Sequence, residues 1–407
     1  MKEITSQSKI NAFLIAMLPI LGPYSITTGG VGIVDIILIM VIIVTAIRSR
    51  YFTVNKGLFY LLLFLGAISI FALVGTNSSR LNLILSLKVY IMFVIYTIGF
   101  GILCYNTDKE YLISVVQKIG ILCATLAIFQ FVFVSAGFDG FYSGRLPLPL
   151  NQYSAFGSLR DITGAVRVHS FFEEPSYLAI YELPIIIYSL QRKQYKAVVI
   201  LSVGCALSGT MLGISGLLVV FVGTLLLGET TSNQKIGIVA LAIIAILAVI
   251  ILYEKNASVH SMIDYYLYRY SKLSVDFTRD TSSVSQRIIG NLPLFNNYNV
   301  FNQIFGVGVN QYPVFFGLTD SYSNVVVTTL LNYGYLGIIA LFVFAIRLFL
   351  RVEKSGIMQV ILFVMIMCID LIWFNEYFFY LIAWIIAFGS KDDTILLTMG
   401  SVRRKQT

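Results

Sequence analysis

Long apolar runs separated by short polar segments are the feature that most constrains how this chain can fold. A helix that crosses a membrane needs about 20 mainly apolar residues, and run after run meets that length. Hydrophobic residues make up 58% of the chain and charged residues 12%, whereas a soluble domain carries about 25% charge. The sequence therefore predicts an all-α, polytopic integral membrane protein, with residues 1–407 forming a single membrane domain.

The segment 197–228 decides the number of membrane spans. Ten further apolar runs lie near residues 10–28, 31–47, 57–75, 83–105, 112–136, 173–190, 236–253, 323–346, 356–374 and 377–390. Segment 197–228 could form one over-long helix or two short helices broken at Ser208-Gly209-Thr210. If the segment forms two helices, the chain has about twelve spans and its short basic loops all lie on one side of the membrane. If it forms one helix, basic segments lie on both sides of the membrane. Because Lys and Arg excess marks the cytoplasmic face, we predict two helices and cytoplasmic termini.

Several classes of function are not expected. The four cysteines (Cys104, Cys123, Cys205 and Cys368) all fall in apolar runs, which indicates small hydrophobic side chains and not a disulfide framework or a metal site. Two histidines are too few for a histidine-rich metal centre. The phosphate-binding pattern GxxxxGK[ST] is missing, so no ATP-driven pump core is predicted. Most of the cations behind the net charge of +8 lie in the predicted cytoplasmic loops, so we expect no nucleic-acid partner. We also expect no cofactor.

Two long polar segments, 137–172 and 254–322, fall on the outer face in the twelve-span arrangement. Loops of this length are usually functional or disordered, and these are rich in Tyr, Phe and Leu. We therefore predict two ordered outer loops that carry the function.

The first outer loop leads into a polar helix start. It carries Arg145, Arg160, Arg167 and His169. Glu173 and Glu174 follow, and Pro175 is well placed as the first residue of the next helix. Two interpretations remain open: carboxylates that only start a helix, where the helix dipole favours them by about 0.3–1 kcal/mol, or a functional site shared with Arg167 and His169. Ionisable residues beside hydrocarbon favour the second.

The second outer loop is rich in cations. It carries Lys255, Arg269, Lys272, Arg279 and Arg287. Each cation taken alone would be explained as part of an ordinary solvated surface, partly neutralised by Asp264, Asp276 and Asp280. Planar guanidinium groups bind phosphate through paired charge-assisted hydrogen bonds, so the set as a whole favours an anionic ligand.

Several short motifs follow one another along the chain. They are Arg167 with Phe171-Phe172-Glu173-Glu174-Pro175-Ser176, Leu207-Ser208-Gly209-Thr210-Met211-Leu212-Gly213, Arg287, Phe305-Gly306-Val307-Gly308, and Asn324 before Gly334-Tyr335-Leu336-Gly337. Together they resemble the motifs of the O-antigen and capsule repeat-unit polymerases (Wzy-type), within the O-antigen ligase/polymerase superfamily. The resemblance covers residues 160–345. The glycine-rich segment Gly306-Val307-Gly308-Val309-Asn310-Gln311-Tyr312 lacks the third glycine of a dinucleotide fingerprint and indicates a tight turn toward the membrane.

The resemblance implies a GT-C-like membrane glycosyltransferase of the bacterial inner membrane. Such an enzyme moves a growing glycan from undecaprenyl diphosphate onto the next lipid-linked repeat unit, by inversion and without a metal. It also implies a chain-length regulator as a possible partner. The diphosphate-binding arginines would be Arg167 and Arg287, and the general base would be Glu174 or Asp320. Substrate contacts would come from His169, Arg145, Arg279, Arg269, Tyr312 and Asn324.

Two alternatives remain. Ligases of the superfamily commonly carry His-Asn before the Gly-x-x-Gly turn, and Ser323-Asn324 at this position argues against a ligase without excluding one. A flippase for lipid-linked oligosaccharides would explain the intramembrane ionisable residues, which are Asp35, Lys88, Lys118, Glu182 and Asp370. Alternating-access transporters, however, place their site at the midplane and not in one-sided outer loops.

Overall fold

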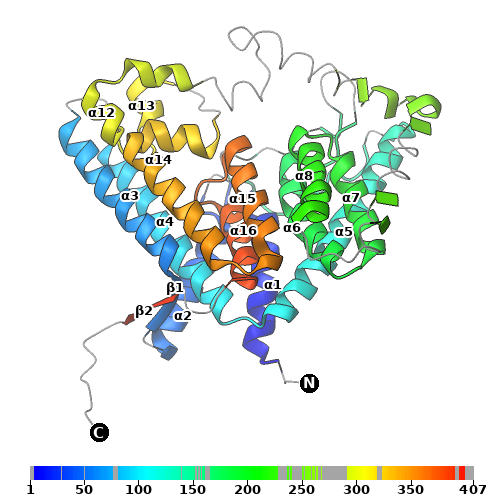
Figure 1. Ribbon diagram of the computed structural model, residues 1–407, viewed down its shortest axis with the longest axis horizontal. Coiled ribbons are helices and arrows are strands. Elements are labelled where there is room, and N and C mark those ends of the chain that lie inside the picture. The colour runs from blue at the N-terminus through cyan, green and yellow to red at the C-terminus, as the bar shows by residue number, and fades with distance from the viewer. Residues whose placement is uncertain are drawn as a thin grey trace.

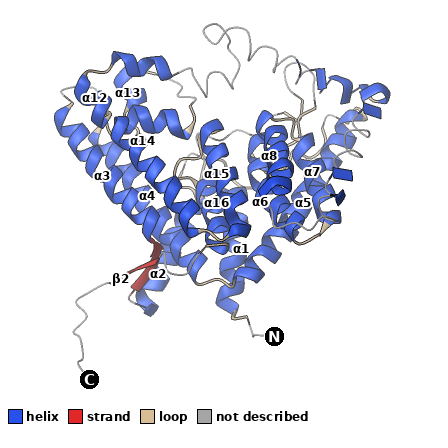
Figure 2. Cartoon of the chain, in the orientation of Figure 1, coloured by secondary structure: helices blue, strands red, loops and turns tan. Residues whose placement is uncertain are grey.

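The computed structural model is mostly helical (Figures 1 and 2). It describes residues 4–28, 30–49, 51–76, 81–138, 140–151, 154, 156, 158–160, 166–227, 291–318, 323–389 and 394–398, with separate residues between 236 and 267. Helices suit a membrane chain because they satisfy their own backbone hydrogen bonds where no water is present. The predicted helical class is therefore confirmed, with one small two-stranded sheet added.

Each predicted apolar run in the described residues contains a helix, although α1 and α15 end several residues before the predicted runs do, and the predicted run 236–253 lies largely outside the described residues. The first half contains α1 (Ser6–Leu21), α2 (Ile33–Ser49), β1 (Tyr51–Asn55), α3 (Lys56–Gly75), α4 (Leu83–Tyr105), α5 (Lys109–Ser135), α6 (Pro175–Gln191), α7 (Tyr195–Leu207) and α8 (Met211–Leu227). The second half contains η2 (Leu292–Asn297), α12 (Val300–Phe305), α13 (Tyr312–Phe316), α14 (Val325–Arg351), η3 (Lys354–Gly356), α15 (Ile357–Ile369), α16 (Glu376–Ala387) and β2 (Thr394–Thr398).

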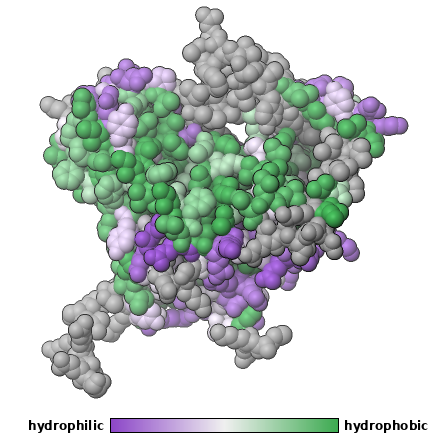
Figure 3. All heavy atoms as spheres, viewed as in Figure 1, coloured by the Kyte–Doolittle hydropathy of each residue, from purple (hydrophilic) through white to green (hydrophobic). Residues whose placement is uncertain are grey.

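Four helices in the described part of the chain are long and apolar enough to cross a membrane: α3, α4, α5 and α14. Their outward faces carry exposed large apolar side chains such as Ile70 and Phe342, both 65% exposed. Figure 3 shows the apolar surface as a band across the middle, with polar patches above and below it. A surface of this kind is stable in contact with lipid, which indicates a protein embedded in a membrane.

The segment 197–228 forms two helices, as predicted. α7 ends at Leu207 and α8 begins at Met211, with Gly209 between them at φ +67°. The hydroxyl group of Thr210 accepts a hydrogen bond from the Gly213 N–H at 2.9 Å, which starts α8. The break therefore depends on one residue in a left-handed conformation and on one capping side chain.

The two strands tie the end of the chain to its first quarter. β1 and β2 pair antiparallel from Tyr51 opposite Thr398 to Asn55 opposite Thr394. They lie at the end of the helices where α1 begins and α14 ends, drawn at the bottom of Figure 1. Basic residues at helix ends gather there too: Arg48, Lys56, Lys109, Arg192 and Arg351. We call this the basic end, and the opposite one the loop end.

The predicted tight turn at Phe305–Gly308 packs against a kink in α14. Gly306, Gly308 and Gly334 all have positive φ. A Cβ atom on Gly306 would lie 2.1 Å from the carbonyl oxygen of Asn332, so only glycine allows this approach. Asn332 Oδ1 accepts from the Gln311 N–H at 3.1 Å. The glycine motif therefore serves backbone-to-backbone packing.

α6 lies at the centre of the helix assembly. It packs against α5, α7, α8, α15 and α16, and nearly all of its side chains are buried. A central helix fixes the position of its first turn more firmly than a surface helix would. The residues at the start of α6 are therefore held by the whole assembly.

Candidate functional site

α6 begins at the loop end, and its first residue is the predicted one. Glu174 is its N-cap in an extended conformation (φ −124°, ψ 149°), and Pro175 is its first residue. The Glu174 side chain makes no capping hydrogen bond to the helix backbone, and its Oε2 accepts from the Ser176 hydroxyl at 3.2 Å. The carboxylate thus contacts a side chain of the first helical turn and not its backbone, and it is half-buried.

Two stacked tyrosines join this helix start to that of α16. The rings of Tyr177 and Tyr377 lie 4.2 Å apart between centroids, at 21° between planes. Glu173 and Glu174 lie within electrostatic range of both phenols. So does Glu376, the first residue of α16. Carboxylates from two distant parts of the sequence therefore surround one tyrosine pair.

Two aspartates extend this carboxylate cluster. Asp370, which follows α15, lies within electrostatic range of Tyr177. Asp35, in the first turn of α2, lies within range of Glu376 and accepts a hydrogen bond from the Tyr96 hydroxyl at 3.0 Å. In the described residues, no three histidine, cysteine or carboxylate side chains converge with the geometry of a metal site.

Tyr24 connects the carboxylates to the first outer loop. Its phenol oxygen accepts a hydrogen bond from the Leu146 N–H at 2.7 Å. Arg145 and Glu173 both lie within electrostatic range of this phenol. Burial raises the pKa of Tyr24 above its ordinary value, so the phenol stays protonated at neutral pH. One neutral hydroxyl thus lies near a guanidinium group and a carboxylate.

A buried glutamine fixes the shape of that loop. Gln130 of α5 is fully buried; its Oε1 accepts from the Ser170 N–H at 2.8 Å and its Nε2 donates to the Tyr142 carbonyl at 3.1 Å. Gly144, with φ +83°, lies so close to Ser170 that a Cβ atom would come within 1.5 Å of the Ser170 carbonyl oxygen. The two halves of the loop are therefore in backbone contact.

The three predicted arginines of this loop differ in surroundings. Arg160 donates from Nη2 to the Val134 carbonyl at 2.8 Å, which satisfies a carbonyl group at the end of α5. Arg145 is exposed. Arg167 is half-buried, and its buried Nε has no hydrogen-bond acceptor among the described residues. Arg167 thus has donor capacity for a ligand, whereas Arg160 serves the fold.

His169 lies beneath the loop surface. Its side chain is 1% exposed, and its ring meets Phe156 edge-on at 5.8 Å. Direct contact with a substrate would therefore require the loop above it to move.

Asn324 and Tyr312 have structural partners. Asn324 caps α14 through its Oδ1, which accepts from the Val327 N–H at 2.8 Å, and its Nδ2 donates to the Cys368 carbonyl at 2.8 Å. Tyr312 is buried in a small apolar cluster with Phe295 and Tyr298. Asn324 nevertheless lies close to the carboxylate cluster, because the N–H of the next residue, Val325, donates to the Asp370 carbonyl.

Four predicted site residues lie outside the described residues: Arg269, Arg279, Arg287 and Asp320. Reasoning from the sequence also missed members of the cluster. Glu376 was not selected at all, and Asp35 and Asp370 were considered only as signs of a transporter. A signal did exist, since each is an ionisable residue at the edge of an apolar run.

The sequence matches no protein-family model and no curated protein. The arrangement of the described residues is therefore the basis for the functional proposal below.

Proposed function

We propose that this protein is a polymerase of lipid-linked glycan repeat units, for O-antigen or capsular polysaccharide. It would transfer the growing glycan from undecaprenyl diphosphate onto the next lipid-linked unit. The observation that carries the proposal is the loop end of α6, where Glu174 joins a carboxylate cluster and Arg167 keeps a donor for a ligand. Acid–base and anion-binding groups are the two things that such a transfer needs.

The proposed reaction is a single inverting displacement. A hydroxyl oxygen of the acceptor sugar forms a bond to the anomeric carbon of the donor, and the bond from that carbon to the diphosphate oxygen breaks. The electron pair leaves with the diphosphate, whose charge Arg167 and Arg287 neutralise. Glu174 takes the proton of the attacking hydroxyl, a role that requires an oxygen within about 3 Å of it. Asp320 is the second candidate for this base.

The same proposal includes the setting of the enzyme. It would be a GT-C-like protein of about twelve spans in the bacterial inner membrane, with the loop end outside and both termini in the cytoplasm. The gathering of basic residues at the opposite end supports this orientation. Its partners would be the lipid-linked oligosaccharide, the bilayer and a regulator of chain length.

The proposal is tested by purified protein in defined vesicles with a synthetic undecaprenyl-diphosphate repeat unit. We expect a ladder of products that share one lipid carrier. In cells, deletion of the gene should leave surface glycan of single units. Long but unattached lipid-linked glycan would instead identify a ligase, and accumulation in the inner leaflet would identify a flippase.

A further inference from the structure

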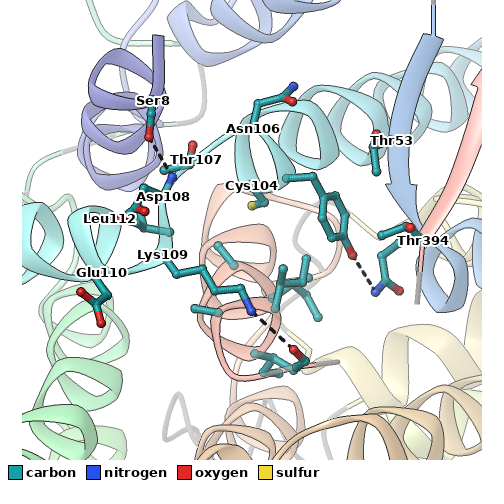
Figure 4. Close-up of a pocket in the computed structure, with 18 of the residues that line it drawn as sticks. Ser8, Thr53, Cys104, Asn106, Thr107, Asp108, Lys109, Glu110, Leu112 and Thr394 are labelled. Atoms are coloured by element: carbon teal, nitrogen blue, oxygen red, sulfur yellow. Dashed lines mark hydrogen bonds between the residues drawn. The ribbon is translucent and has the colours of Figure 1, made fainter. Parts of the chain in front are cut away.

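The basic end contains a cavity of about 720 Å³ that the proposed transferase chemistry does not use. It lies where α1 begins, α4 turns into α5, and α14 and α16 end, beside the two-stranded sheet (Figure 4). The volume falls within the range of small-molecule sites, about 300–1,000 Å³. Six separate segments of the chain meet around it, including both strands of the sheet.

One wall of the cavity is polar and already fixed by internal hydrogen bonds. The Ser8 hydroxyl oxygen accepts from the Asp108 N–H at 2.7 Å, which ties α1 to α5. Asn55 donates from Nδ2 to the Tyr105 hydroxyl oxygen at 3.2 Å, and its Oδ1 caps α3 by accepting from the Leu58 N–H at 3.1 Å. A wall held in this way loses little conformational entropy when a ligand binds.

The charged groups of the cavity favour an anion. Lys109 extends into it and donates to the Gly389 carbonyl at 3.5 Å, which engages one of its three N–H donors (Figure 4). Arg351, the last residue of α14, also lines the cavity. Of the two acidic residues, Asp108 accepts from the Tyr111 N–H at 3.0 Å as the cap of α5, and Glu110 points away from Lys109 in Figure 4.

The lining also includes the apolar side chains of Leu112, Leu348, Ile382, Ile385 and Ile386. From this combination we propose that the cavity binds a phosphate ester, with Lys109 and Arg351 holding the phosphate and the apolar side chains receiving a hydrocarbon part. Two kinds of molecule carry such a phosphate ester, a membrane lipid and a water-soluble phosphate ester. The proposal is independent of the transferase activity.

The test is thermal unfolding of the full-length protein in detergent with three matched ligands. Dihexanoyl phosphatidic acid supplies phosphate and acyl chains, glycerol 3-phosphate supplies the phosphate alone, and dihexanoylglycerol supplies the chains alone. A ligand that binds only the folded protein raises the unfolding temperature in a concentration-dependent way, which gives its affinity. For each variant we compare the unfolding temperature with and without ligand, because the loss of a charge at a helix end also alters the stability of the protein without ligand.

We expect Lys109→Ala and Arg351→Ala each to weaken phosphatidic acid binding about tenfold or more, the effect of one lost charge-assisted hydrogen bond. Lys354→Ala, an exposed cation outside the cavity, is the matched control and should leave the affinity unchanged. Ala387→Phe should block binding by filling the cavity without a change of charge.

A shift with phosphatidic acid alone identifies a lipid as the source, and equal shifts with glycerol 3-phosphate identify a soluble ester. Either result supports the site. The proposal is overturned if neither phosphate ligand shifts the transition, if dihexanoylglycerol alone gives the same shift, or if the shift persists in the Lys109, Arg351 and Ala387 variants.

Discussion

Tyr177 stacks on Tyr377 with ring centroids 4.2 Å apart, which joins the first turn of α6 to the first turn of α16 across 200 residues of sequence. Stacked aromatic pairs contribute about 0.5–1.5 kcal/mol beyond the area that they bury. The pair also brings Glu174 and Glu376 to the same pair of phenols. The carboxylate cluster at the loop end is therefore a product of the packing between these two helices.

The first prediction concerns Glu174. If this carboxylate is the general base, Glu174→Gln should lower the rate of glycan transfer about 10²–10⁴-fold, because an amide cannot take the proton. Its effect on stability should be small, since the amide oxygen of glutamine can still accept from the Ser176 hydroxyl. The measurement is single-turnover transfer in defined vesicles.

Glu376→Gln is the comparison, because it makes the same side-chain change at another acidic position near the same tyrosine pair. A loss as large as that in the Glu174 variant would mean that the charge of the cluster matters and that Glu174 has no individual role. Normal transfer by the Glu174→Gln enzyme would return this residue to a purely structural role.

The second prediction separates two arginines of one loop. Arg167→Ala should abolish transfer with little change in unfolding temperature, because its buried Nε has no hydrogen-bond acceptor among the described residues. Arg160→Ala should lower the unfolding temperature, because one charge-assisted hydrogen bond is lost, although the Val134 carbonyl still accepts from the Gly137 N–H at 3.0 Å. Arg167→Lys should restore only part of the activity, since lysine lacks the paired guanidinium donors. Full activity of Arg167→Lys would contradict paired phosphate binding.

The third prediction concerns the contact between the two halves of the first outer loop. Gly144→Ala should destabilise the protein by about 1–3 kcal/mol, since its φ is +83° and the new Cβ would meet the Ser170 backbone. Gly140→Ala is the matched control, because a Cβ atom there has nothing within 4 Å. Thermal unfolding followed by a thiol-reactive dye suits this measurement, since Cys104, Cys123 and Cys205 are buried. Equal unfolding temperatures for the two variants would show that the loop halves do not pack as described.

The fourth prediction concerns Glu182, in the middle of α6. It is fully buried, and neither carboxyl oxygen has a hydrogen-bond partner among the described residues. A buried polar group without a partner costs about 1–3 kcal/mol, so Glu182→Met should raise the unfolding temperature. A lower unfolding temperature would show that the carboxyl group has a stabilising partner. Loss of transfer in a more stable variant would instead assign the carboxyl group a functional role.

The fifth prediction concerns orientation. In a background that lacks the exposed Cys368, Gly140→Cys should react with a membrane-impermeant thiol reagent added to intact spheroplasts. Lys196→Cys, at the basic end, should react only after the membrane is opened. The reverse pattern would place the carboxylate cluster on the cytoplasmic side and exclude a transfer reaction on the outer face.

The start of α6 shows what was predictable from local sequence. Pro175 has no N–H to lose at the first helical position, and its fixed φ suits a helix, so the helix start follows from one residue. The break at Ser208–Thr210 was predictable in the same way, although the argument used the distribution of charge along the whole chain. Helix ends that lack such a local signal were predicted less closely, since α1 ends at Leu21 and α15 at Ile369, both inside their apolar runs.

The roles of polar residues were harder to predict. Asn324 and Tyr312 were selected as substrate contacts, yet one caps α14 and the other lies in an apolar cluster. Gln130, which holds the first outer loop together, was not selected, although a glutamine within an apolar run is a visible signal. The partner of a polar side chain is usually distant in sequence, and a single sequence carries no record of which distant residue that is.

The sequence by itself determined that this chain forms apolar helices long enough for a membrane and where most of them begin and end. Hydrophobicity and local hydrogen bonding act over one helix length, so they can be read along the chain. Only the tertiary structure decided that carboxylates at the starts of α2, α6 and α16 and after α15 lie within electrostatic range of one another or of the same tyrosine pair, and that a charged cavity forms at the basic end. Both result from the packing of helices that are far apart in sequence, which depends on the shapes of whole surfaces.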